Sequence, residues 1–390
     1  MSQHIPDELF EQLVALRRDI HQHPELSWEE ERTADVIEAR LRALGLTPRR
    51  MAGTGVVAEI PGASDGPMVA LRADTDALPV HEDTGLAFAS IHEGVMHACG
   101  HDGHTTMLLG AAELLLKGPP PPLPVRLLWQ PAEEKGAGAP AMIREGVLDG
   151  VEMIFGGHVD RRYPAGVLIV TEGPVNASTD TFHLTIRGQS GHGARPHEAL
   201  DAIVVGSLLV TAIQTVVSRE VNPAHPSVIS VGRFQAGSAP NVIAGHAILE
   251  GTIRAQETSV RDHLRQSIKR IADAIGQLHG AQIDVEVRVG TPALHNTAAM
   301  TALAATAAVD VVGREKVTEL RTANMGGEDF AYFLEHVEGC YIRFGSQVLG
   351  RESFPAHSGQ FDIDERALGC GAAWFAAIAR RAGEAVLARR

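Results

Sequence analysis

The stretch from Met96 to His104 places three histidines, one cysteine and one aspartate within nine residues. Thiolate sulfur, imidazole nitrogen and carboxylate oxygen are the protein groups that bind transition metals. The segment after His104 is apolar and typical of a helix, so the cluster lies at a strand-to-helix junction, where α/β folds place their sites. The alternative is a polar turn around an ordinary buried thiol, and the density of ligand-type residues argues against it. A tight site takes about four ligands per ion, so other parts of the chain must contribute.

The length and charge of the chain limit its class. A chain of 390 residues is too long for one compact core, so we expect two domains. The net charge of -14 argues against nucleic acid or an anionic membrane as a partner. We find no apolar run long enough to span a bilayer and no secretory signal at the N-terminus. Three cysteines are a sparse, odd number that suggests reduced thiols, so we expect a cytoplasmic protein without disulfides.

Ligand-type residues recur where predicted strands end. We expect strands at 55–60, 68–73, 125–129 and 153–155, and the last three are followed by Asp74 with Asp76, Glu133 with Glu134, and His158. The aspartate pair alone is equally well explained as a solvated turn, and the glutamate pair as a helix N-terminus. Two neighbouring glutamates can also have different roles in a metal site, one binding the metal and the other acting as a general base. Because loops at one edge of a parallel sheet converge, the recurrence predicts a single site.

The order of the remaining elements predicts an inserted domain. Residues 1–178 and 291–390 fit an α/β fold with a mixed, mostly parallel sheet flanked by helices, and Ser27 to Glu30 resemble a capping box for a helix ending near Gly45. Residues 179–290 follow the order βαββαβ of a ferredoxin-like split βαβ domain. This insertion carries His192 in a glycine-flanked loop, which either reaches into a cleft or is an ordinary surface loop. His357, near the C-terminus, is the last candidate ligand.

The motifs taken together resemble those of the co-catalytic metallohydrolases of the aminoacylase and carboxypeptidase G type. The resemblance is closest to their hippurate hydrolase branch, which includes indole-acetyl-amino-acid and bacterial N-acyl-amino-acid amidohydrolases. Six motifs carry it, in the family order: Arg72–Pro79, His97–His104, Gln130–Glu134, Gly191–His197, Gly326–Asp329 and Ala356–Gly359. Two departures, Lys135 where relatives usually have glycine and Ala244 where proline is common, make substrate preference harder to carry over.

The resemblance implies a site with two divalent ions, which could be zinc, manganese, cobalt or nickel. It implies five ligands, with Cys99 bridging in the place of a family aspartate: Cys99, His101, Glu134, His158 and His357. His101 and His158 would complete one ion's site, and Glu134 and His357 the other's. The other implied roles are a general base (Glu133), groups behind the ligands (Asp76 and Asp102), a histidine that reaches across a dimer to the scissile carbonyl (His192), and binders of the substrate carboxylate (Asn241 and Arg254).

The activity implied by the resemblance is that of a metal-dependent amidohydrolase. Such an enzyme uses metal-activated water to cleave N-acyl or N-aroyl amino acids, such as hippurate, into a carboxylate and a free amino acid. A dipeptidase or carboxypeptidase of the same fold is the enzyme alternative. A non-catalytic binding protein is the alternative from another class, and Glu133 argues against it because a pure binder needs no base. The inserted domain is expected to act as a lid and to form a homodimer or a higher homo-oligomer.

Overall fold

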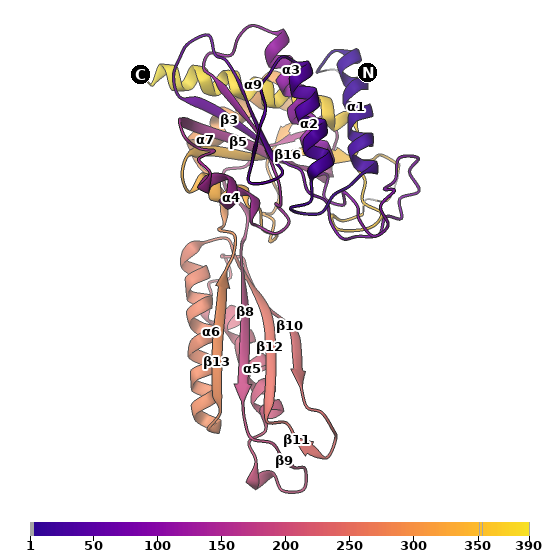
Figure 1. Cartoon of the computed structure of the whole chain (residues 1–390). Helices are drawn as coiled ribbons and strands as arrows, with labels where there is room; N and C mark the ends of the chain where they lie inside the picture. The colour runs from indigo at the N-terminus through magenta and orange to yellow at the C-terminus, as the bar shows by residue number, and fades with distance from the viewer. Residues whose placement is uncertain (1–3, 351, 353, 390) are drawn as a thin grey trace. The chain divides into compact units, whose positions relative to one another are not determined.

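The structure is a computed structural model that describes residues 4–350, 352 and 354–389. The chain divides into two compact units (Figure 1). Unit 1 contains Met1–Val175, His295–Thr322 and Asp329–Arg390, and unit 2 contains Asn176–Leu294 and Ala323–Glu328. The sequence prediction places residues 323–328 in the α/β domain instead. These residues belong to unit 2 because the side-chain amide of Asn176 donates hydrogen bonds to the backbone oxygens of Gly326 and Gly327.

Unit 1 is built on the predicted mixed sheet. Its strands are β1 (Arg49–Met51), β2 (Gly55–Ile60), β3 (Met68–Asp74), β4 (Val125–Gln130), β5 (Val151–Pro164), β6 (Leu168–Ile169), β15 (Val317–Thr318) and β16 (Glu338–Gln347), in the spatial order β1-β2-β4-β3-β5-β16-β6-β15. The central strands β4, β3, β5 and β16 run parallel, whereas β1–β2, β2–β4 and β16–β6 are antiparallel pairs. The parallel strands β3, β4 and β16 are almost entirely buried, because helices cover such strands on both faces.

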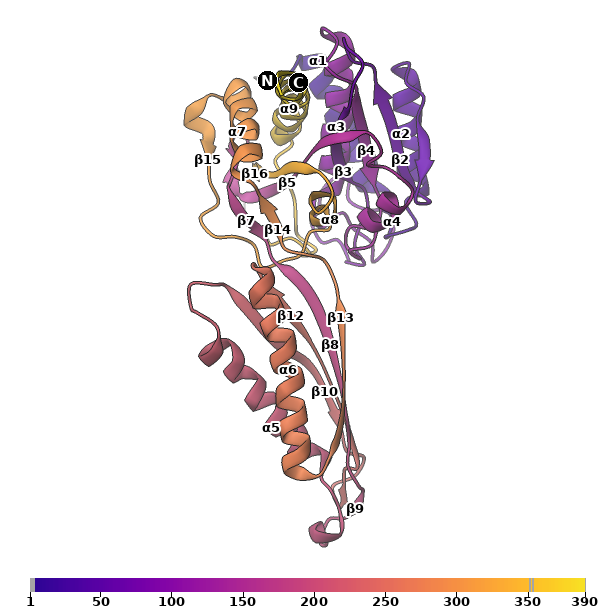
Figure 2. The same cartoon turned by 90° about the vertical axis from the view of Figure 1, so that its left-hand side faces the viewer.

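The helices of unit 1 flank this sheet, as Figure 2 shows. They are α1 (Asp7–Gln22), α2 (Glu31–Ala43), α3 (His101–Lys117), α4 (Gly138–Arg144), α7 (Ala298–Val312), α8 (Phe330–Leu334) and α9 (Arg366–Ala388). Nearly every residue of α3 is buried, because α3 packs between α1, α9 and strand β3. Gly110 permits this close packing, since a Cβ there would lie 2.7 Å from Leu13 and 2.8 Å from Ala372.

Strand β5 is longer than the sequence predicts. The prediction ends the strand at Phe155, whereas β5 continues through His158 to Pro164. Two consecutive glycines are typical of a strand end, but Gly156 and Gly157 instead leave space for aromatic rings that pack against the strand. A Cβ at Gly156 would lie 2.8 Å from the ring of Phe330. His158 therefore lies within a strand and faces Arg343 of β16 in register, which fixes its backbone firmly.

The predicted capping box at the start of α2 is wrong. Helix α2 begins at Glu31, and Ser27 makes no capping hydrogen bond. The carboxylate of Glu25 performs this function, because it accepts hydrogen bonds from the backbone amides of Arg32 at 2.9 Å and Thr33 at 2.8 Å. The hydroxyl of Ser27 instead contacts Asp76, which belongs to the site described below.

Unit 2 has the predicted βαββαβ order. Its main elements are β8 (Ser178–Arg187), α5 (Ala202–Thr215, extended by a π-helical turn Val216–Glu220), β10 (Ser227–Ala236), β12 (His246–Ala255), α6 (Thr258–His279) and β13 (Gln282–Val289). The strands form an antiparallel sheet in the order β10-β12-β8-β13. The apolar faces of α5 and α6 pack on one side of this sheet and form a separate hydrophobic core.

Short strands complete the described chain. In unit 2, β9 (Gly191–His192) pairs with β11 (Val242–Ile243). Strands β7 (Gly173–Asn176) and β14 (Leu294–Asn296) occur where the chain passes between the units.

Helix Ala202–Glu220 corrects one expectation. By length and composition it is the one helix among the described residues that is apolar enough to cross a bilayer, although the sequence analysis finds no such run. A single helix of this kind is weak evidence of a membrane span, since core helices pass the same test. Leu209 and Ile213 of this helix are fully buried in the core of unit 2, whereas Ile203, Val204 and Leu208 are exposed.

Candidate metal centre

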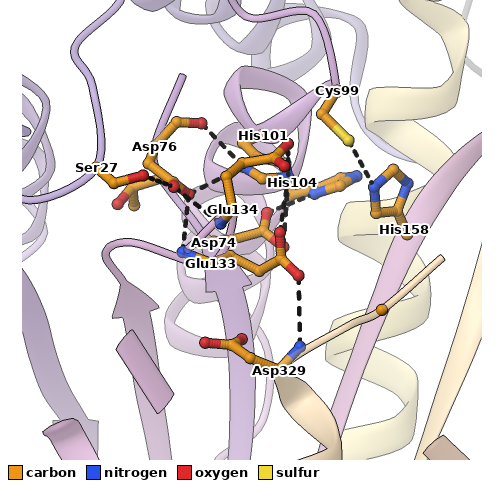
Figure 3. Close-up of polar contacts among 12 residues, drawn as sticks. Ser27, Asp74, Asp76, Cys99, His101, His104, Glu133, Glu134, His158 and Asp329 are labelled. Carbon is orange, nitrogen blue, oxygen red and sulfur yellow. Dashed lines mark hydrogen bonds and ion pairs between the residues drawn. The ribbon is translucent and has the colours of Figure 1, made fainter. Parts of the chain in front are cut away.

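Ligand-type side chains from several elements of unit 1 converge on one site (Figure 3). Cys99 precedes α3, His101 is its first residue, Glu134 follows β4, and His158 lies within β5. Gly100 makes the turn into α3 possible for two reasons. Its φ of 93° is in the left-handed region, and a Cβ there would lie 2.5 Å from the side chain of Val159.

The five predicted ligands form two overlapping groups. The candidate ligand atoms of Cys99, His101 and His158 lie within 4.8 Å of one another, and so do those of Cys99, Glu134 and His357. The sulfur of Cys99 is 3.2 Å from Nε2 of His158, and Nε2 of His357 is 3.3 Å from Oε1 of Glu134. Cys99 belongs to both groups, so its sulfur is placed where one ligand would be shared by two ions.

Two buried polar atoms in this site point to a cation. Within the described residues, Nε2 of His101 has no hydrogen-bond partner, and Oε1 of Glu134 has only the 3.3 Å contact to His357, although buried polar atoms are normally hydrogen-bonded. Nδ1 of His101 lies 2.9 Å from the backbone oxygen of Asp76 and donates to it, which leaves a lone pair on Nε2. Sulfur, nitrogen and oxygen donors around such a gap suit a transition metal.

The electrostatics of the site lead to the same conclusion. Burial, reinforced by the negative charge of Glu134, raises the pKa of the Cys99 thiol to about 12. Burial opposes a charge on His101, but Asp74 and Asp76 outweigh it and raise the pKa of that imidazole well above its ordinary value, so an ion bound at Nε2 would take the place of a proton there. A thiolate at Cys99 therefore requires a nearby cation, and a divalent ion is the group that commonly deprotonates a coordinating thiol.

Asp76 connects three of the predicted site residues. Its Oδ1 accepts hydrogen bonds from the backbone amide of Glu133 at 3.1 Å and from Nδ1 of His101 at 3.2 Å. Its Oδ2 accepts from the amide of Glu134 at 3.0 Å and from the hydroxyl of Ser27 at 2.7 Å. Asp76 therefore lies behind His101, where the sequence analysis expects it, and it also anchors the backbone that carries both glutamates.

Asp102 makes contacts that differ from the expectation. Its Oδ2 accepts a hydrogen bond from Nε of Arg17 at 2.6 Å and lies 2.9 Å from Nδ1 of His21. Burial disfavours the Asp102 carboxylate, but Arg17 outweighs this effect and lowers its pKa well below the usual range. Its carboxylate thus joins α1 to the first turn of α3 and is not hydrogen-bonded to a predicted ligand within the described residues.

A buried network that was not predicted from the sequence supports the loop that carries Glu133 and Glu134. Arg72 donates to Asp74 at 2.7 Å and to Asp329 at 2.8 Å. The carboxylate of Asp329 also accepts from the side chain of Gln130, and its backbone amide contacts Oε1 of Glu133 at 3.4 Å (Figure 3). The charge of Arg72 among the apolar residues of β3 is the sequence signal that predicts a buried acidic partner.

His104 performs a second supporting function that was missed. Its Nδ1 lies 2.6 Å from Oδ1 of Asp74, and its Nε2 accepts a hydrogen bond from the amide of Val159 at 2.9 Å. Both ring nitrogens are therefore used, which leaves His104 no lone pair for a metal. This contact holds β5 beside α3 at the residue that follows His158.

Three predicted residues belong to unit 2. His192 is exposed on β9, pairs in register with Val242 of β11, and lies close to Asn241, whose backbone oxygen accepts the amide of Gly193 at 2.8 Å. Arg254 of β12 makes one weak contact, at 3.5 Å, to the backbone oxygen of Met325. Among the described residues Arg254 has no ion-pair partner, so its guanidinium can still bind a carboxylate.

Comparisons with known proteins agree with this geometry. Residues 70–381 match the family model described as peptidase family M20/M25/M40. The chain is 42% identical to an N-acetyl-L-cysteine deacetylase of Bacillus subtilis, over 92% of this chain and 85% of the relative. It is 37% identical to thermostable carboxypeptidase 1 of Saccharolobus solfataricus, over 95% of each chain.

A solved structure from Bacillus subtilis has the same fold along the whole chain. It is the YXEP protein, described as a dinuclear metal binding peptidase from the M20 family. The TM-score is 0.86 at 35% sequence identity, and the match covers 97% of this chain and 99% of that one. The extent of the family match and of these identities leads to one conclusion: this chain belongs to peptidase family M20/M25/M40.

Proposed function

We propose that this protein hydrolyses the amide bond of N-acyl amino acids, including hippurate-like ones, to a carboxylate and a free amino acid. The observation that carries the proposal is the pair of ligand groups that share Cys99, with Glu133 beside them. Oε2 of Glu133 lies 3.9 Å from Nε2 of His101, so a carboxylate that is outside both Cys99 groups borders the same gap.

Cys99, His101, Glu134, His158 and His357 would hold two divalent ions. Their thiolate and imidazole donors favour a softer metal such as zinc over magnesium, and the family resemblance adds manganese, cobalt and nickel. When bound, such ions lower the pKa of a water molecule and polarise an amide carbonyl. The fit of the donors supports both the metal requirement and a hydrolytic reaction.

Glu133 is the proposed general base. It would take a proton from the attacking water and return it to the leaving nitrogen of the amide. Its position is fixed at both ends. Its backbone amide is bound by Asp76, and its carboxylate accepts the amide of Asp329. A base fixed in this way is ready to transfer a proton without reorganisation.

Unit 2 would supply substrate recognition. Arg254, with Asn241, would bind the substrate carboxylate, since a guanidinium can bond both of its oxygens. His192 would polarise the scissile carbonyl of a partner subunit. A homodimer is supported by the apolar surface of α5, where Ile203, Val204 and Leu208 remain 42%, 48% and 41% exposed. An acyl amino acid as substrate is supported by the similarity to the Bacillus subtilis deacetylase.

A carboxypeptidase is the second candidate function. The similarity to thermostable carboxypeptidase 1 favours it, and the same residues would carry out the same hydrolysis. The difference lies in the group on the carbonyl side of the amide bond, which is a peptidyl group in one case and a simple acyl group in the other.

A panel of benzoyl-, acetyl- and dipeptidyl-amino acids tests these functions. We expect N-acyl amino acids to be cleaved with the higher kcat/KM, and chelation to abolish cleavage until a divalent metal is restored. Preference for dipeptides would support the carboxypeptidase, and absence of cleavage in the whole panel by metal-loaded protein would contradict both.

The substitution Arg254→Ala should raise KM for these anionic substrates about 10- to 100-fold, because a hydrogen bond to a charged group is lost. Substrates with an amidated C-terminus should be cleaved equally by both proteins. Arg187→Ala is a matched control, since Arg187 in the same sheet is already paired with Asp284. An unchanged KM in Arg254→Ala would remove Arg254 from the carboxylate site.

A further inference from the structure

The segment Glu25–Glu30 joins α1 to α2, and we name it the brace segment. It runs beside two loops of the metal centre, one with Asp76 and the other with Glu133 and Glu134. Leu26 forms a parallel bridge with Ala77, and the amide of Ala77 donates to the backbone oxygen of Glu25 at 2.8 Å. Within the segment, Ser27 and Glu30 are buried, whereas Trp28 and Glu29 between them are exposed. Its two buried polar side chains therefore face the interior of unit 1.

Glu30 is fully buried and holds a distant loop. Its Oε1 accepts the backbone amide of Ala132 at 2.9 Å, and its Oε2 accepts the hydroxyl of Thr54 at 2.6 Å. A carboxylate is costly to bury unless donors surround it. Because helix α2 is capped by Glu25 instead, the capping of α2 does not account for Glu30.

The residue that Glu30 holds has an unusual backbone. Ala132 has a φ of 51°, in the left-handed region that residues with a Cβ rarely adopt. Ala132 immediately precedes Glu133 and Glu134. If Ala132 relaxed to an ordinary conformation, the chain direction after it would change and both carboxylates would turn away from the site. The hydrogen bond from Ala132 to Glu30 opposes that relaxation.

Ser27 acts on the same loop from its other side. Its hydroxyl donates to Oδ2 of Asp76 at 2.7 Å, and that oxygen also accepts the amide of Glu134 (Figure 3). Asp76 is almost fully buried, so its orientation is set by these few donors. The brace segment thus contacts the loop that carries Glu133 and Glu134 directly at Ala132 and indirectly through Asp76.

We propose that Glu30 and Ser27 are positioning residues of this site, which fix the left-handed turn at Ala132 and the carboxylate of Asp76 and so direct Glu133 and Glu134. The effect on Glu133 rests on the proposed hydrolytic function, because it is measured as a loss of kcat. The effect on Glu134 is measured by metal affinity alone. The positioning proposal and the hydrolytic function can therefore be contradicted separately.

The test compares five variants of the protein, one of them a control, by manganese affinity in competition with a chelator, and by kcat and KM at saturating metal. Glu30→Ala should weaken metal affinity about 10- to 100-fold, as loss of a group supporting a ligand does. It should lower kcat about 10-fold or more and change KM less than about 3-fold, since the substrate contacts are elsewhere. Glu30→Gln should remain within about 3-fold of wild type, because its amide can accept from Ala132 and donate to Thr54.

The double variant Glu30→Ala with Ala132→Gly should regain about 5-fold or more of both losses, because glycine adopts a positive φ without steric cost. Ser27→Ala removes one hydrogen bond and is the milder variant if Glu30→Ala does not fold. It should weaken metal affinity about 3- to 10-fold.

Glu113→Ala is the matched control, since Glu113 is a buried glutamate of the same unit that pairs with Arg40 and Lys117. It should lower the melting temperature but leave metal affinity and kcat unchanged. Wild-type affinity and kcat in Glu30→Ala, equal losses in Glu113→Ala, or no recovery on Ala132→Gly would each overturn the proposal. If wild type cleaves no N-acyl amino acid, the affinity series alone decides it.

Discussion

The substitution Glu133→Gln is expected to lower kcat about 10²- to 10⁴-fold, which is the usual contribution of a positioned general base. Glutamine has nearly the same size but cannot accept a proton from water at neutral pH. The backbone amide of residue 133 would still donate to Asp76, so the loop and the Glu134 ligand should stay in place. Steady-state kinetics on an N-acyl amino acid, with metal content measured on the same sample, checks this expectation.

A control separates this effect from a general loss of fold. Glu145→Gln alters a carboxylate of unit 1 that accepts the backbone amide of Ala52 and is outside the metal-binding groups. It should retain wild-type kcat. If Glu133→Gln kept more than about a tenth of the wild-type kcat with its metal bound, the base would have to be another group.

The substitution Cys99→Ala should have the other large effect, since Cys99 is the residue common to both ligand groups. We expect metal content to fall below one ion per chain and hydrolysis to fall to the background rate, because both ions lose a ligand. His158→Ala should be less severe, since His158 belongs to one of these two groups. Cys99→Asp should regain part of the activity, because the two oxygens of a carboxylate can bridge two cations.

Elemental analysis of the purified variants, together with kcat/KM, provides the measurement. Cys370→Ala is the matched control, because Cys370 is also a buried thiol, lies in α9 and should not affect metal content. Two tightly bound ions in active Cys99→Ala protein would show that Cys99 is not the shared ligand.

The fold of unit 2 could be predicted from the sequence because its elements follow simple periodicities. Strand β8 alternates between buried and less buried residues, β13 alternates between half-buried and exposed residues over most of its length, and α6 has one apolar face. In unit 1, the mostly apolar runs of β2 and β4 make these strands equally easy to recognise in the sequence. Asp76, which follows β3, contacts Glu133 and Glu134, which follow β4, at the predicted site.

The remaining features depend on residues far apart in the chain. Gly156 and Gly157 resemble a strand end, and only the rings of Phe330 and Phe344 explain why β5 needs glycine there. Ser27 and Glu30 satisfy the local rule for a capping box, but contacts with Asp76 and Ala132 prevail. Local patterns cannot reveal such partners, because these contacts arise only once the whole sheet has formed.

The most direct test of the two-ion centre is anomalous diffraction from crystals of the protein loaded with zinc or manganese. We predict two peaks per chain. One would be bound by Cys99, His101 and His158, and the other by Cys99, Glu134 and His357, with a zinc–sulfur distance of about 2.3 Å for the shared thiolate. A single peak that does not contact Cys99, or peaks elsewhere on the chain, would contradict it.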